Sequence, residues 1–476
     1  MGVKKNIIYT TILTSSNYIF PLIVYPYVSR VLGVHNIGLC NFIDSVIDYF
    51  ILISMMGVNI VGTRLIAADQ SKKEKLNQTF SSLLTLNGLF TALALLFLCI
   101  ATLLVPDLSE NREMMGYGAL KVVSNFLLLE WLFRGLEDFK FITYRSLLVK
   151  CLYVVAIFIF VRERTDYSTY YLLTVLTLTG NAVVNVWFSK RFVDFKRKLI
   201  NFKYIWKPFL ILGGYLILTS LYTKFNIVFL GFTTDDAQVG YYTTATKLYS
   251  IFLAVFSGVS TVLMPRMSSL LAEKKIDEFK VMIYKSINYL LSLSFPVIIL
   301  TVIFSPQVIY LISGPGYEGA ATPMRIIMPL MLIIGYEQIQ VIQCLMPLGS
   351  DKIIMRNSII GAVVGVVFNL LFVPMLKSVG AAITWVIAEL IILYLSQIAL
   401  KHKLGMKFPF KDLLNFILYY TPLAGILIIL YYFSTDLEYW VSLILAAATT
   451  AIYFLILQIF ILKDPIFKTI LSKIKS

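Results

Sequence analysis

The stretch from Ile353 to Val373 reads IIMRNSIIGAVVGVVFNLLFV, and the stretch from Ala381 to Ala399 reads AAITWVIAELIILYLSQIA. Each is an apolar run of about the twenty residues that a helix needs to cross the hydrocarbon core of a bilayer. Neither shows the regular alternation of an outer-membrane β-strand, and in lipid only helices and closed barrels satisfy their backbone hydrogen bonds. These two stretches therefore predict consecutive transmembrane helices.

The rest of the chain has the same character. Hydrophobic residues make up 59% of the 476 residues and charged residues only 14%, whereas an ordinary soluble domain is about one quarter charged. The sequence predicts an all-α integral membrane protein with about fourteen spans. The other twelve are Ile7–Leu32, Leu39–Val61, Phe80–Val105, Gly118–Phe133, Ser146–Val161, Tyr170–Phe188, Phe209–Phe232, Val239–Leu263, Ile287–Phe304, Ile326–Leu345, Leu413–Phe433 and Trp440–Leu462.

The positive charge of the chain follows the order of the loops. The formal net charge is +15, and most of the 41 Lys and Arg residues fall before the first span or after every second one. Because cytoplasmic loops of membrane proteins carry the excess of Lys and Arg, this pattern predicts that the N- and C-termini are both cytoplasmic. The basic charge is thus a topological signal, and we expect no nucleic-acid partner. Contact of the inner clusters with anionic membrane lipids is a further expectation.

Two halves of the chain resemble each other. Leu32-Gly33, Ile37-Gly38, Gly57-Val58 and Arg64 recur about 200 residues later as Leu230-Gly231, Val239-Gly240, Gly258-Val259 and Arg266. Both halves would begin in the cytoplasm, so the repeat is parallel, and such repeats commonly enclose the substrate site of a transporter. We expect two six-helix bundles and two extra C-terminal helices around a central cavity. The predicted boundaries are 1–189, a basic cytoplasmic linker at 190–207, 208–400, and 401–476 with the extra helices and the tail.

Several ionisable residues lie inside predicted spans, where they are costly and usually functional. Asp44 and Asp48 share one face of the second span, and Lys224 and Lys247 lie at similar depth in the second half. With Arg30, the two lysines are candidates to bind a diphosphate, because Lys offers a point charge and Arg a bidentate fork. The carboxylates are candidates to bind a coupling cation or proton. The alternatives are that acids and lysines only neutralise each other, and that Arg30 extends to the membrane interface.

The remaining polar residues argue against enzyme chemistry. There are only two histidines and four isolated cysteines, with no glycine-rich phosphate loop, so we expect no catalytic residue, metal or cofactor. For Glu337 and Glu389 the simplest interpretation is an interhelical hydrogen bond. Glu130 and Arg134, four residues apart, predict an ion pair within one helix.

Five segments of the chain carry a resemblance to a known family. They are PYVSRVLGVHNIG from Pro26, EWLFRGLEDFKFITYRSLL from Glu130, FLGFTTDDAQVGYYTTATKLYS from Phe229, VLMPRMSSLLAE from Val262 and LMPLGSDK from Leu345. They resemble the bacterial polysaccharide-repeat-unit flippases, the polysaccharide-transport branch of the superfamily that also holds the multidrug and toxic-compound exporters and the lipid II flippases. The similarity extends over the whole chain, although each motif alone is loose.

The resemblance implies a function. Such a protein moves undecaprenyl-diphosphate-linked oligosaccharide from the cytoplasmic to the outer leaflet of the bacterial inner membrane, for O-antigen of lipopolysaccharide, capsule or exopolysaccharide. It also implies a positive cavity at Arg30, Lys224 and Lys247, a coupling ion such as H⁺ or Na⁺, and partners such as a polysaccharide polymerase. One departure is Asn226, where family members often carry an acid, and it puts ion coupling at that position in doubt.

Other functions remain open at this point. A lipid II flippase and a cation-coupled multidrug exporter are the nearest alternatives. A membrane sugar transferase or polymerase is a more distant one, because the predicted outer loops are too short to hold an acceptor and catalytic carboxylates.

Overall fold

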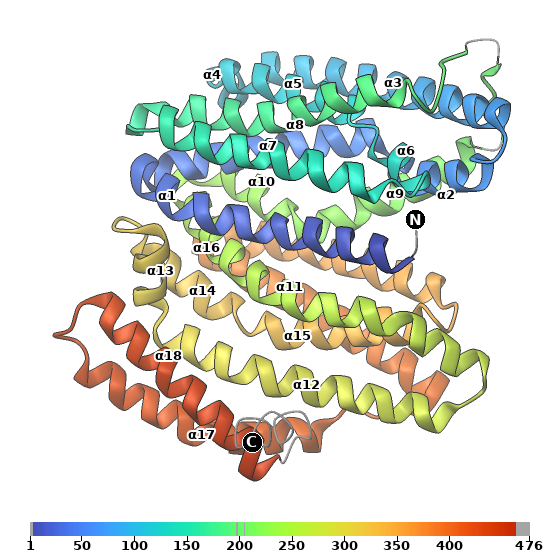
Figure 1. Ribbon diagram of the computed structural model, residues 1–476. Helices are drawn as coiled ribbons and strands as arrows, with labels where there is room; N and C mark the ends of the chain where they lie inside the picture. Colours follow the sequence, from blue (N-terminus) through green and yellow to red (C-terminus); the bar gives the residue numbers. More distant parts are fainter. Residues whose placement is uncertain (1–2, 197–198, 204, 463–476) are drawn as a thin grey trace. The chain divides into compact units, whose positions relative to one another are not determined.

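The computed structural model describes residues 3–196, 199–203 and 205–462, and all regular secondary structure in this part of the chain is helical (Figure 1). Every predicted span coincides with a helical segment, so the predicted all-α fold is confirmed. The chain divides into two compact units, Met1–Gly240 and Tyr241–Ser476.

The first unit contains ten helices and the start of an eleventh in its described residues. They are α1 (Val3–Met55), α2 (Val58–Asp69), α3 (Lys73–Leu104), α4 (Pro106–Glu110), α5 (Arg112–Leu127), α6 (Glu130–Gly135), α7 (Phe139–Phe160), α8 (Tyr167–Ser189), α9 (Trp206–Thr223), α10 (Phe225–Thr233) and the first turn of α11 (Asp236–Ala272).

The second unit continues α11 and is otherwise built from long helices with short connections. They are α12 (Ile276–Ile303), α13 (Ser305–Ser313), α14 (Ala321–Ile327), α15 (Leu330–Gln338) with a π-helical extension (Ile339–Leu345), α16 (Asp351–Leu404), α17 (Phe410–Phe433) and α18 (Tyr439–Ile456) with a π-helical end (Leu457–Ile461).

Two very long helices each hold a pair of predicted spans. Helix α1 is interrupted at Gly33, whose φ of 76° lies in the region that glycine adopts without steric cost. Helix α16 is interrupted at Lys377, with φ 51°. Both interruptions fall between predicted spans, so each continuous ribbon changes course where the sequence predicts a turn.

Nine helices in the described ranges are long and apolar enough to cross a membrane, or ten if the bent pair α9 and α10 forms one span. This number counts α1 with α2 as one helix and α16 as one helix, although each is interrupted. The fourth predicted span is split into α5 and α6 at Leu129, which has φ 48°. The chain is a multi-pass membrane protein, and fourteen as the number of crossings stays a prediction.

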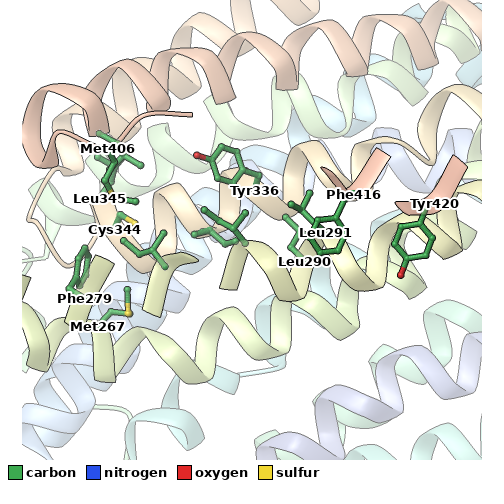
Figure 2. Close-up of a cluster of buried hydrophobic side chains, with 14 of the residues drawn as sticks. Met267, Phe279, Leu290, Leu291, Tyr336, Cys344, Leu345, Met406, Phe416 and Tyr420 are labelled. Carbon is green, nitrogen blue, oxygen red and sulfur yellow. The ribbon is translucent and has the colours of Figure 1, made fainter. Parts of the chain in front are cut away.

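Each unit has its own apolar core. In the first, Trp131 of α6 is fully buried against Phe80 of α3, with ring centroids 5.8 Å apart, and Gly62 of α2 leaves room for the indole. In the second, Figure 2 shows side chains of α12 beside those of α15 and α17, with Leu290 and Leu291 between Tyr336 and Phe416. These contacts pack neighbouring helices closely against one another.

The basic linker predicted at 190–207 connects α8 and α9, and polar side chains of α3 hold its backbone. Asn77 accepts a hydrogen bond from the backbone N–H of Asp194, and the hydroxyl oxygens of Ser81 and Ser82 accept from those of Lys196 and Asn201. The compact units divide later, after Gly240, because α9 and α10 pack on α1. The four predicted sequence domains and their repeat remain predictions.

Candidate functional site

The two intramembrane carboxylates predicted from the sequence lie on the second half of α1 and face α5. The ammonium group of Lys121 on α5 is 2.6 Å from Asp44 Oδ1 and 3.0 Å from Asp48 Oδ1. Asp44 and Asp48 are one helical turn apart, so a single cation on the facing helix reaches both. The Lys121 side chain is 15% exposed, which makes this the most enclosed ion pair of the group.

Lys224 lies where the helical structure is interrupted. It is the residue between α9 and α10, whose axes differ by 52°. Its ammonium group is 2.6 Å from Asp48 Oδ2, and its side chain is 47% exposed. Interrupted helices with a charged residue at the break are typical of substrate and ion sites in transporters. The structure therefore brings together three of the charges that the sequence singles out.

The cluster of Asp44, Asp48, Lys121 and Lys224 contains two carboxylates and two ammonium groups, so its formal charge is zero. Asp48 bridges the two lysines and uses one oxygen for each. An anionic ligand would have to compete with Asp48 for Lys224, whereas Lys121 is already committed to two partners. We call this set the balanced cluster.

The sequence reasoning missed Lys121 as a member of the site. Lys121 lies in the predicted span Gly118–Phe133. A lysine within an apolar run usually has a partner or belongs to a site. The packing of α5 against α1 determines which carboxylates Lys121 contacts, and hydropathy does not predict this packing.

Two further predicted site residues lie elsewhere. Arg30 is exposed near the end of the first half of α1, and its Nη1 donates to the carbonyl oxygen of Pro26 on the same helix. Lys247 is on the part of α11 that belongs to the second unit and is half-buried. The convergence of Arg30, Lys224 and Lys247 on one ligand stays a prediction.

A second group of charges in the first unit joins α6 and α7. The carboxylate of Glu130 is 3.0 Å from Arg134 Nη2, which confirms the predicted pair within one helix, and 3.5 Å from Nη2 of Arg145 on α7. Five residues further along α7, Lys150 donates to Ser16 Oγ at 2.7 Å and to Asn17 Oδ1 at 2.6 Å, both on α1.

In the second unit, Glu389 on α16 is buried and accepts a hydrogen bond from Trp385 Nε1 of the same helix at 2.9 Å. Glu337 is on α15. The interhelical hydrogen bond expected for these two acids stays a prediction.

Comparison with known proteins identifies the family. The model of the family described as polysaccharide biosynthesis protein matches residues 3–271, which is more than half of the chain. The chain belongs to the polysaccharide biosynthesis protein family. A second model, MatE, matches residues 212–371.

This polysaccharide biosynthesis family member spans nearly the full length of two relatives. It is 25% identical to a putative O-antigen transporter of Escherichia coli strain K12 over 82% of this chain and 95% of that protein. It is 24% identical to a putative O-antigen transporter of Shigella dysenteriae over 84% of this chain and 100% of that protein.

Among solved structures, the lipid II flippase MurJ in an inward closed conformation superposes with a TM-score of 0.78. The alignment covers 95% of this chain and 99% of that one at 12% identity. At this identity the likeness establishes the fold alone, which is that of the lipid II flippases and the related multidrug exporters.

Proposed function

We propose that the protein is a flippase that moves undecaprenyl-diphosphate-linked oligosaccharide from the cytoplasmic to the outer leaflet, for O-antigen, capsule or exopolysaccharide synthesis. The observation that carries the proposal is the membership of a polysaccharide biosynthesis family in a chain whose fold matches a flippase over 95% of its length. The names of the O-antigen transporter relatives support the same assignment.

The proposal includes the setting of the protein. It places the protein in the bacterial inner membrane with both termini in the cytoplasm. The alternation of basic loops along the sequence supports this orientation. In this proposal the protein transports its substrate without making or breaking covalent bonds. Its partners are membrane lipids, a polysaccharide polymerase and other assembly proteins. It takes H⁺ or Na⁺ as the driving ion, with no other cofactor.

Reconstituted vesicles test the function directly. A fluorescent polyprenyl-diphosphate sugar should move between leaflets in proteoliposomes and stay in place in liposomes without protein. Unchanged distribution in both would overturn the proposal, and equal movement of a lipid II analogue or export of a drug would favour the alternatives. A pH or sodium gradient imposed on the same vesicles identifies the coupling ion.

The Lys224→Ala and Lys247→Ala variants should each reduce flipping by about tenfold or more, because an ammonium group that binds a diphosphate contributes a charge-assisted hydrogen bond. Lys224 is half exposed, so its removal should leave the fold intact. Lys75→Ala, which removes an exposed charge at the start of α3, is the matched control. Full flipping activity in both cavity variants would assign these lysines to charge pairing.

A further inference from the structure

We propose that the charges joining α6 and α7 form a binding site for a phosphate-type anion, which we call the α6–α7 site: Glu130, Arg134, Arg145 and Lys150. The inference rests on the proposed function for its ligand, the diphosphate of a lipid-linked sugar. The α6–α7 site differs from the balanced cluster in its position and in its charge. It also contains buried hydrogen-bond donors that have no acceptor among the described residues.

The first step is charge. Two arginines share one carboxylate, because Glu130 contacts both Arg134 and Arg145, and Lys150 adds a third cation five residues along α7 from Arg145. The formal charge of the α6–α7 site is therefore +2, whereas the balanced cluster sums to zero. A site inside a membrane protein with uncompensated positive charge favours an anion that enters the membrane.

The second step is burial. The side chain of Arg145 is 4% exposed, and its ion pair with Glu130 uses Nη2 at 3.5 Å. Its Nε and Nη1 are inaccessible to solvent and have no hydrogen-bond partner among the described residues. A buried charged donor without a partner costs free energy, so these nitrogens need an acceptor that the protein itself does not provide there.

The third step is geometry. The guanidinium fork of arginine matches the oxygens of a phosphate, and the ammonium group of lysine adds a point charge. Arg145 and Lys150 are about 7.5 Å apart along α7, at 1.5 Å of rise per residue. The backbone positions that hold them are well defined: Asp138 caps the start of α7 by accepting from the N–H of Phe141, and Thr143 donates to the carbonyl oxygen of Tyr9 on α1.

The position in the fold suggests a role. Ser16 and Asn17, the partners of Lys150, are in the first half of α1, about 20 Å along that helix from Arg30. The basic loops predict that this end of α1 is cytoplasmic. The α6–α7 site would therefore hold the headgroup when it enters from the cytoplasmic leaflet, before it reaches Lys224.

Binding of inorganic pyrophosphate and of geranyl diphosphate to the full-length protein in a neutral detergent tests the site. Arg145→Gln and Lys150→Gln should each weaken binding of either probe by about tenfold or more. Arg145→Lys keeps the charge without the fork and should weaken it less. Lys140→Gln, which removes an exposed charge in the first turn of α7, is the matched control and should bind like the wild type.

Glu130→Gln distinguishes a binding role from a structural one. Removing the carboxylate leaves three cations without a protein anion, so pyrophosphate should bind several-fold more tightly to this variant. If the charges only join α6 to α7, Glu130→Gln would not tighten binding. Unchanged binding in Lys150→Gln and Arg145→Lys, or weaker binding in Glu130→Gln, would overturn the proposal even if Arg145→Gln fails to fold.

Two further results separate the ligand and the function. Phosphatidylglycerol at the concentration of the geranyl diphosphate probe should displace little of it, and full displacement would show that the site holds a lipid headgroup and that the assignment to the carrier diphosphate is wrong. Binding that depends on Arg145 and Lys150 in a protein that flips no lipid-linked sugar would overturn the proposed function and keep the anion site. If the protein flips the lipid-linked sugar but anion binding does not depend on Arg145 or Lys150, the α6–α7 site would be overturned and the proposed function kept.

Discussion

The Lys121→Met variant should be about 3 kcal/mol less stable than the wild type, because breaking an enclosed ion pair leaves its partner charge without compensation. The ammonium group of Lys121 is 2.6 Å from the carboxylate of Asp44 and 3.0 Å from that of Asp48, which also contacts Lys224. Its loss leaves two carboxylates on one face of α1 with Lys224 alone. Thermal unfolding of the detergent-solubilised protein, followed by intrinsic fluorescence, measures the effect.

Lys224→Met is the matched control for this measurement. It removes one ammonium group from the same cluster, but its side chain is 47% exposed, and Lys121 still contacts both carboxylates. We expect a loss well under that of Lys121→Met, since solvent-exposed pairs contribute about 1 kcal/mol or less. The double variant Lys121→Met with Asp44→Asn restores the charge balance and should recover part of the stability. Equal losses of stability in Lys121→Met and Lys224→Met would contradict the conclusion that Lys121 makes the more enclosed ion pair.

The helices could be predicted from the sequence because their cause is local. An apolar run of the required length must form a helix in lipid, since no water is present to satisfy the backbone. The two interruptions, at Gly33 and Lys377, separate predicted spans for the same reason: the apolar runs end there.

The site was only partly predictable, because partners are a tertiary property. The rule that charges inside the membrane are functional indicated Asp44, Asp48 and Lys224, and the structure brings these three together. The same rule applied to Lys121 would have added the fourth member. Arg145 is a different case, since the positive-inside pattern explains it fully at the level of sequence, and only its burial shows that it is more than a topological signal.

The division of the chain illustrates a further limit. The most charged segment, 190–207, predicts a linker between the halves, but composition does not show that Asn77, Ser81 and Ser82 hold its backbone against α3. Those three side chains are polar and buried in the first part of α3, where the linker backbone supplies their hydrogen-bond partners.

The Gly38→Ala variant should lose about 3 kcal/mol of stability or more, since overpacking against rigid backbone is among the larger effects of a single methyl group. A Cβ on Gly38 would overlap the backbone carbonyl oxygen of Asp236 and lie 2.9 Å from the backbone nitrogen of Gly240, at the start of α11. Neither neighbour is a flexible side chain, so the two helices would have to separate. Gly116→Ala on α5, where a Cβ meets nothing within 4 Å, is the control and should change stability little. Equal unfolding temperatures for the two variants would contradict this.

The same contact makes a prediction about the repeat. Gly38 and Gly240 occupy corresponding positions in the two predicted halves, and a Cβ on Gly240 would in turn overlap the carbonyl oxygen of Val34 on α1. Because both glycines serve one helix contact, Gly240→Ala should be as damaging as Gly38→Ala, and the double variant should lose less than the sum of the single losses. Additive losses would mean that the two glycines relieve separate contacts. Unfolding measurements on the four proteins decide between these results, and sub-additivity would show why the two halves both keep a glycine at this position.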